Sequence, residues 1–125
     1  MSGVTFDAGG LIALDKDDRR VIALLARAAE IGATITIPAT ALAQALRKPA
    51  RQARLSRLVR QPSTDLVALD GLDATSVGVL LAASRSSDMV DAHVVICARR
   101  SREPIVTSDP KDIRRLDPEA SLIVV

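Results

Sequence analysis

Short apolar runs alternate with helical segments along almost the whole chain, and this alternation limits the possible folds more than any other feature. Clusters of β-branched or apolar residues predict strands at residues 4–6, 34–37, 66–69 (weak), 105–107 and 122–125. Helical periodicity and capping residues predict helices at residues 8–14, 17–32, 39–46 and 50–60, after a cap at Asp73, after a cap at Ser87 or Asp88, and at residues 110–116. Strands that alternate with helices form βαβ units. The sequence therefore predicts a three-layer α/β/α sandwich around a mostly parallel sheet.

The size and composition of the chain favour one domain, spanning residues 1–125. Hydrophobic residues make up 48% of the sequence, which is enough for a core, but no apolar run reaches the roughly 18 residues that a membrane span needs. The first residues lack the basic and apolar stretches of a signal peptide, and the single cysteine, Cys97, cannot form an internal disulfide. We therefore expect a soluble protein in the reducing cytoplasm, with no membrane partner.

Basic residues gather in one segment although the net charge is only +2. Between residues 47 and 60 there is no acid, and the six basic residues are Arg47, Lys48, Arg51, Arg54, Arg57 and Arg60. Two interpretations stay open, a solvated helix face or a patch that binds phosphates. Phe6 is the only aromatic residue, so a surface that stacks nucleic-acid bases is nearly excluded. An RNA partner would be held through its phosphates by arginines and backbone amides.

Aspartates occur at three separate places where they can meet. Asp7 directly follows the first predicted strand, and a pair begins the helix near residue 88. Another pair follows the strand at residues 105–107. The two pairs are Asp88 with Asp91 and Asp109 with Asp112. Each aspartate has an alternative role as a helix cap or in offsetting the helix dipole. Ligands of parallel sheets bind beyond the carboxyl ends of the strands, so we expect the three places to share one edge.

Several carboxylates in one pocket repel one another unless a cation is present. The sequence has no cluster of His and Cys for zinc, so Mg²⁺ or Mn²⁺ is the expected ion. Carboxylates that hold such an ion are suited to hydrolysis of phosphodiester bonds. A phosphatase with Asp7 as nucleophile is disfavoured, because the second acid expected two residues later is replaced by Gly9. His93 is predicted to point away from the carboxylates and to pack or face solvent, and Cys97 to be a buried, inert thiol.

Four segments together resemble the PIN-domain family, and within it the VapC-type toxins of bacterial toxin–antitoxin pairs. The resemblance extends from residue 4 to residue 125. Its segments are Thr5-Phe6-Asp7, Ile37-Pro38-Ala39-Thr40-Ala41-Leu42-Ala43-Gln44, Asp88-Met89-Val90-Asp91-Ala92-His93 and Ile105-Val106-Thr107-Ser108-Asp109-Pro110. The order and spacing of the segments carry the resemblance, because each segment alone is a weak signal.

The resemblance implies a dimeric endoribonuclease that requires Mg²⁺ or Mn²⁺. It further implies a structured RNA substrate, such as tRNA, and an antitoxin that holds the enzyme inactive. By position, Asp7, Asp91 and Asp109 look like the catalytic, metal-binding acids, and Asp88 and Asp112 like supporting or second-metal acids. Thr40 and Ser108 are candidates to contact the water shell of the metal, although capping or turn roles are equally open.

One position departs from the family pattern. The family usually has Glu six residues after the proline of the second strand, and this chain has Gln44 there. An amide can orient a water molecule, but it is a poor ligand for Mg²⁺. Either Asp88 supplies the missing charge, or the domain is a weak or inactive nuclease that binds RNA or an antitoxin without cutting.

Overall fold

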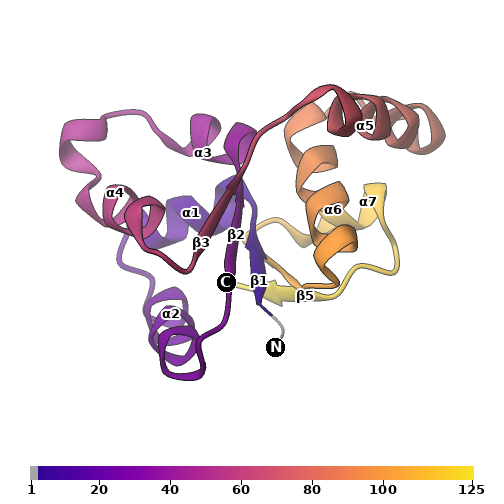
Figure 1. Cartoon of the computed structure of the whole chain (residues 1–125). Helices are drawn as coiled ribbons and strands as arrows, with labels where there is room; N and C mark the ends of the chain where they lie inside the picture. The colour runs from indigo at the N-terminus through magenta and orange to yellow at the C-terminus, as the bar shows by residue number, and fades with distance from the viewer. Residues whose placement is uncertain (1–2) are drawn as a thin grey trace.

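A five-stranded sheet, in which all paired strands are parallel, forms the centre of the computed structural model (Figure 1). The structure describes residues 3–125, so Met1 and Ser2 of the predicted domain lie outside the described residues. The strand order is β3-β2-β1-β4-β5. The strands are β1 (Val4–Phe6), β2 (Ile35–Pro38), β3 (Thr64–Val67), β4 (Ile105–Thr107) and β5 (Leu122–Val124).

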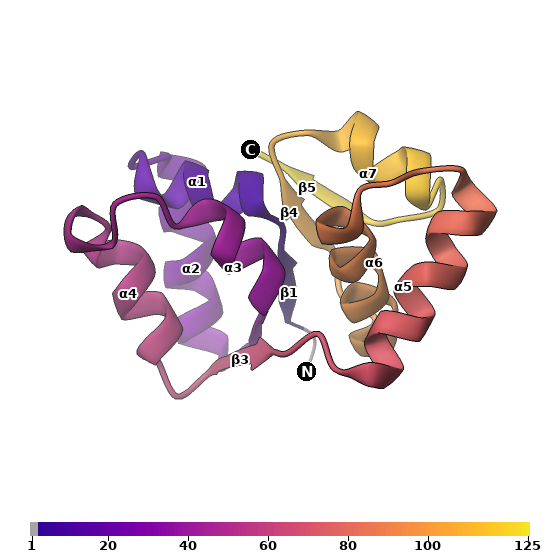
Figure 2. The same ribbon diagram turned by 90° about the horizontal axis from the view of Figure 1, so that it is seen from above.

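Helices cover both faces of the sheet. Seen from above, α1 to α4 lie on one side of the strands and α5 to α7 on the other (Figure 2). The helices are α1 (Ala8–Asp15), α2 (Arg19–Ile31), α3 (Ala39–Ala45), α4 (Ala53–Arg60), α5 (Gly71–Ser84), α6 (Met89–Ser101) and α7 (Pro110–Leu116), with a 3₁₀ turn at Pro49–Arg51. The predicted three-layer α/β/α sandwich is confirmed.

Several helix ends follow from their capping residues. The Asp18 side chain accepts the N–H of Arg20 at the start of α2, and Gly32 ends this helix with a φ of 67°, which glycine adopts without strain. At the start of α6, Asp88 accepts the N–H of Asp91. Of the two caps predicted for this helix, Ser87 and Asp88, Asp88 is therefore the one observed.

Two predicted boundaries are wrong. The third strand covers Thr64–Val67 rather than residues 66–69, because β3 pairs with β2 in a register that places Thr64 opposite Ile35. The helix after it begins at Gly71, and its cap is Asp70 rather than Asp73. Asp73 is instead buried and its side chain forms ion pairs.

The helix predicted at residues 50–60 is also interrupted. Pro49 begins a separate 3₁₀ turn, and α4 starts only after Gln52. The buried Gln52 side chain accepts the N–H groups of Arg47 and Lys48 and donates to the carbonyl of Ala45. These hydrogen bonds satisfy backbone groups of the loop between α3 and α4.

The order in which strands are added to the sheet reverses at β1, which has β2 and β3 on one side and β4 and β5 on the other. The strands β1 and β4 are neighbours, but β1 leads into α1 on one face and β4 leads into α7 on the other (Figure 2). In α/β proteins, ligands bind beyond the strand ends at such a divergence. Asp7 follows β1, and Ser108 and Asp109 follow β4, so these predicted site residues lie at this edge of the sheet.

Candidate metal centre

Asp7 lies at the end of β1 with its side chain buried, at 3% exposure. Its backbone N–H donates to the carbonyl of Val106, and its Oδ1 accepts the N–H of Gly10 at 2.7 Å, so Asp7 also caps α1. Burial raises the pKa of Asp7, the Thr107 hydroxyl and the Gly10 N–H lower it, and the charge of Asp109 raises it further. Asp7 therefore caps α1, as the alternative interpretation of the sequence predicts, and this hydrogen bond holds its carboxylate in place beside β4.

Two glycines let α1 approach β4 closely. A Cβ atom on Gly9 would lie 2.2 Å from the Ser108 hydroxyl oxygen, and one on Gly10 would lie 2.6 Å from the carbonyl oxygen of Val106. Neither position tolerates a side chain without a shift of its neighbour. The Gly9-Gly10 pair thus places Ser108 beside the start of α1, next to Asp7.

Asp91 brings a third chain segment to the same place. It lies half-buried in the first turn of α6, and its N–H donates to Asp88 Oδ1 at 3.0 Å. Burial and the charge of Asp88 are the largest causes that raise the pKa of Asp91 to about 7, and the charges of Asp7 and Asp112 add to this. A carboxylate so strongly perturbed marks a candidate functional site.

Asp109 and Asp112 complete the group from the other side of β4. The N–H of Asp109 donates to the Thr107 hydroxyl at 2.9 Å, and the Asp109 side chain is exposed. Asp112 has a raised pKa, first through its contact with the Asp109 carboxyl and that group's charge, and in part through Asp88, while Arg115 opposes the rise. Electrostatic repulsion therefore links all five carboxylates, which we call the edge carboxylate cluster: Asp7, Asp88, Asp91, Asp109 and Asp112.

The donor chemistry of this cluster fits a hard dication. Within residues 3–125, none of the five carboxylates forms an ion pair with a basic side chain. Among the described residues, the chain thus brings these carboxylates together at one edge of the sheet without a direct ion pair, and their donor atoms are all oxygens. Mg²⁺ and Mn²⁺ prefer such ligands and would remove the repulsion.

The three predicted supporting residues occupy different surroundings. Ser108 is exposed next to Gly9. Gln44 is exposed on α3. Thr40 is half-buried in the first turn of α3, and its hydroxyl lies 3.3 Å from Nδ1 of His93.

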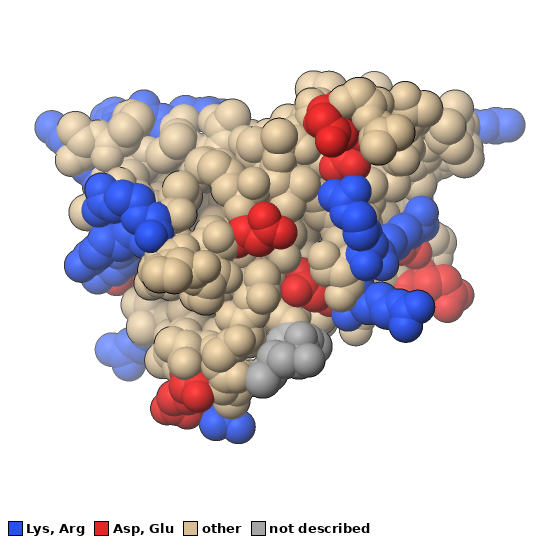
Figure 3. Space-filling model, in the orientation of Figure 1, with Lys and Arg blue, Asp and Glu red and all other residues tan. Residues whose placement is uncertain are grey.

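The predicted RNA-binding residues lie on the surface around α4. Figure 3 shows one group of lysines and arginines on the side of the molecule that α4 occupies, and a second group on the opposite half of the same face. Arg54 pairs with Asp17 at 2.6 Å, which reduces the charge it offers to a ligand. The exposed basic residues of the segment are Arg47, Lys48, Arg51, Arg54, Arg57 and Arg60.

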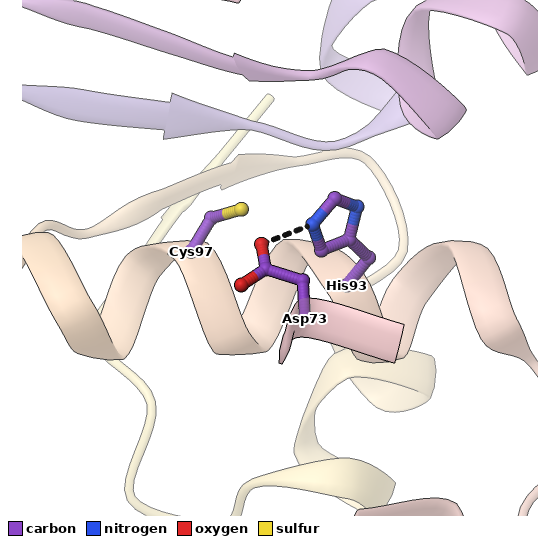
Figure 4. A group of neighbouring side chains, drawn as sticks. All are labelled: Asp73, His93 and Cys97. Atoms are coloured by element: carbon purple, nitrogen blue, oxygen red, sulfur yellow. Dashed lines mark hydrogen bonds and ion pairs between the residues drawn. The ribbon is translucent and has the colours of Figure 1, made fainter. Parts of the chain in front are cut away.

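Among the described residues, the group whose possible ligand atoms all lie within 4.8 Å of one another is elsewhere, at Asp73, His93 and Cys97 (Figure 4). Asp73 Oδ2 lies 2.8 Å from His93 Nε2, and the Arg100 guanidinium donates to both Asp73 oxygens, at 2.7 and 3.0 Å. The carboxylate is thus already neutralised by Arg100, and the hydrogen bond to Arg100 is the main reason that the pKa of Asp73 falls to about 2. Burial raises the pKa of the Cys97 thiol to about 11, so a thiolate ligand is disfavoured and the predicted inert thiol is supported.

His93 is fully buried and both of its ring nitrogens have polar partners. The prediction that it avoids the edge carboxylates agrees with these contacts, but its bond to the carboxylate of Asp73 was missed. Asp73 looked like a helix cap in sequence. The only signal for the pairing was that His93, Cys97 and Arg100 recur at spacings of four and three residues on one helix.

Fold and site together define an α/β protein with a group of carboxylates at the carboxyl edge of its parallel sheet, where β1 and β4 lead to opposite faces. No family model and no curated protein matches the sequence. Among solved structures, this chain is similar to a chain in the crystal structure of VapBC2 from Rickettsia felis bound to a fragment of promoter DNA. The TM-score is 0.68 and the sequence identity is 17%, over 98% of each chain. At this identity the likeness shows a shared fold. At the level of the fold it confirms the resemblance to VapC-type PIN domains predicted from the sequence.

None of the helices within residues 3–125 combines the length and the apolar character needed to cross a bilayer.

Proposed function

We propose that this chain is a Mg²⁺- or Mn²⁺-dependent endoribonuclease that acts as the toxin of a toxin–antitoxin pair. The observation that carries the proposal is the edge carboxylate cluster at the carboxyl ends of β1 and β4, in which neighbouring carboxylates help raise the pKa of Asp7, Asp91 and Asp112. The fold shared with VapBC2 supports it. Asp7, Asp91 and Asp109 would hold the ion, and Asp88 and Asp112 would add negative charge around it.

The residues of this chain would do the remaining work through position and charge. A bound Mg²⁺ supplies a Lewis acid that lowers the pKa of water and stabilises charge on the phosphate. Asp7 is fixed for this role because its Oδ1 is held by the N–H of Gly10. The exposed basic residues around α4 would bind RNA phosphates, because the chain offers a single, fully buried aromatic ring, Phe6.

The proposed partners follow from the same resemblance. VapBC2 was crystallised on promoter DNA. For this chain we propose an antitoxin made alongside it, a homodimeric state, a structured RNA substrate such as tRNA, and a cytoplasmic location. An overlapping upstream gene for a small DNA-binding protein would support the toxin role.

The decisive experiment is cleavage of total RNA and of tRNA by the purified protein. We expect cleavage with Mg²⁺ or Mn²⁺, none in EDTA, and none by Asp7→Asn, since asparagine still caps α1 and leaves the fold intact. Asp65→Asn is the matched control, because Asp65 is exposed on β3 outside the cluster. Cleavage that persists in EDTA would reject the metal mechanism.

The alternative is a PIN-like domain that binds RNA or an antitoxin without cutting. Gln44, which stands where the family usually has Glu, is the residue that favours it. The variant Gln44→Glu tests this alternative. If wild-type protein does not cut RNA because this carboxylate is missing, Gln44→Glu should create cleavage or increase it strongly.

A further inference from the structure

Asp73, His93 and Arg100 form a closed set of polar contacts between α5 and α6, which we call the buried network. Both Asp73 oxygens accept from Arg100, and Oδ2 also pairs with His93 Nε2. In the part of the chain that the structure describes, no buried polar side-chain atom lacks a partner. The buried polar atoms of the network therefore all have hydrogen-bond partners without a ligand, and its contacts with neighbouring helices indicate its role.

The chemistry of Asp73 determines which ring nitrogen of His93 carries the proton. An ionised carboxylate only accepts hydrogen bonds, so His93 Nε2 must donate to Asp73. In the neutral ring Nδ1 is then an acceptor, and the only group at hydrogen-bonding distance from it among the described residues is the Thr40 hydroxyl, at 3.3 Å. Thr40 must donate its proton to the ring, which leaves the lone pairs of its oxygen free on the other side.

These contacts connect the two segments that flank the edge carboxylate cluster. Thr40 lies in the first turn of α3, directly after β2, and β2 is the neighbour of β1, which leads to Asp7. His93 lies two residues after Asp91 on α6. Figure 4 shows His93 and Cys97 on α6, with the ring directed to Asp73. The contact between Thr40 and His93 therefore joins the start of α3 to α6, which carries Asp91.

We infer that the buried network positions the edge carboxylate cluster by fixing the Thr40 hydroxyl as a donor to His93. His93 and Asp73 are thus positioning residues, which act through the hydrogen bond that joins α6 to Thr40 on α3. The inference rests on the proposed function, because it assigns the network a role at the proposed metal centre. Residues that orient metal ligands from behind commonly affect metal affinity by 10–100-fold.

The first test is independent of RNA cleavage. His93 is the only histidine of the chain, so the nitrogen-15 signals of its ring are assigned without ambiguity. At pH 7.5 we expect a protonated Nε2 and an unprotonated Nδ1. A ring protonated at Nδ1, with or without a proton on Nε2, would overturn the inference, because Thr40 could not then donate to it.

The second test measures Mn²⁺ affinity by titration calorimetry in Thr40→Val, Thr40→Ser and His93→Gln. We expect about a tenfold loss in Thr40→Val and His93→Gln, and near-normal affinity in Thr40→Ser, which keeps the hydroxyl. Thr75→Val is the control, since Thr75 is exposed on α5 and its hydroxyl donates only to its own helix.

The outcomes separate this inference from the proposed function. A lower melting temperature with unchanged Mn²⁺ affinity in Thr40→Val would show a purely structural network and overturn the inference. Wild-type protein that binds Mn²⁺ but cuts no RNA would contradict the nuclease and leave the inference standing if Thr40→Val still weakens binding. Wild-type protein that binds no Mn²⁺ overturns both. A thiolate absorption band on Co²⁺ addition, absent in Cys97→Ser, would instead make the network a metal site and overturn the positioning role.

Discussion

Two groups of aspartates in this molecule experience opposite electrostatic conditions. In the edge carboxylate cluster, burial and the charge of Asp88 raise the pKa of Asp91 to about 7. In the buried network, the hydrogen bond from Arg100 lowers the pKa of Asp73 to about 2. Within residues 3–125, Asp73 forms an ion pair with Arg100, and Asp91 forms none. A carboxylate with an internal partner is therefore built for structure, and one without a partner is available to an external cation.

The largest expected difference between the groups is in activity. Asp91→Asn should lower RNA cleavage by more than about 100-fold, because removal of a direct ligand exceeds the effect of outer residues. The same variant should unfold at an unchanged or higher temperature in EDTA, since it removes repulsion with Asp88. Kinetic assays and thermal unfolding of one preparation give both results. Normal cleavage by Asp91→Asn would remove it from the proposed site.

The second largest effect is expected on the stability of the protein, when the buried network is changed. Asp73→Asn should lower the free energy of unfolding by about 2 kcal/mol, because it leaves the Arg100 charge without its partner. We place the loss below that of a fully buried pair because the Arg100 side chain is 53% exposed. Urea unfolding of Asp73→Asn and the control Asp65→Asn measures it. Equal stability of the two variants would show that the buried network contributes nothing to the fold.

The pH dependence of stability should have opposite signs in the two groups. The raised pKa of Asp91 means that the native state holds an extra proton from pH 4 to pH 7, so metal-free protein loses stability as pH rises through this window. The lowered pKa of Asp73 contributes stability that is complete above its ordinary value near 3.8 and is lost as pH falls toward 2. In EDTA we expect a melting temperature roughly 5 °C lower at pH 8 than at pH 5.

Two additions sharpen this pH experiment. Mn²⁺ at pH 8 should restore the lost stability, because it binds the ionised cluster. Asp88→Asn should make the profile less steep, since Asp88 is the strongest charge acting on Asp91, while burial still raises the pKa of Asp91. A flat profile for wild-type protein in EDTA would mean that the carboxylates are not close together.

The smallest effect is expected in the basic segment. Arg57→Ala should weaken RNA binding a few-fold and reduce the salt slope by about one. Arg54→Ala should do less, because Arg54 already pairs with Asp17. Fluorescence anisotropy at several salt concentrations checks this, with Arg27→Ala on α2 as control, because Arg27 pairs with Glu30. An unchanged slope in Arg57→Ala would favour the solvated-face interpretation.

The fold was largely predictable because its signals are local. β-branched runs and capping residues such as Asp18 and Gly32 act within a few residues of the chain. The start of β3 was not predictable, because register with β2 decides it. The break before α4 was missed for a similar reason, since the Gln52 side chain closes the loop through contacts with residues several positions away.

The site was predictable only in part. The rule that ligands bind beyond the carboxyl ends of parallel strands correctly placed Asp7 and Asp109 at one edge. Asp73 was missed because its partner Arg100 is 27 residues away on another helix. An aspartate in the first turn of a helix looks the same in sequence whether it caps the helix or is buried in an ion pair.

Mn²⁺ binding at pH 7, followed together with proton release, tests most directly whether the edge carboxylates form a metal centre. We expect wild-type protein to bind Mn²⁺ and to release protons on binding, because Asp91 is partly protonated at this pH. Asp7→Asn should lose most of the affinity, whereas Asp65→Asn should bind normally. Equal Mn²⁺ affinity in wild-type protein and Asp7→Asn would contradict the existence of this centre.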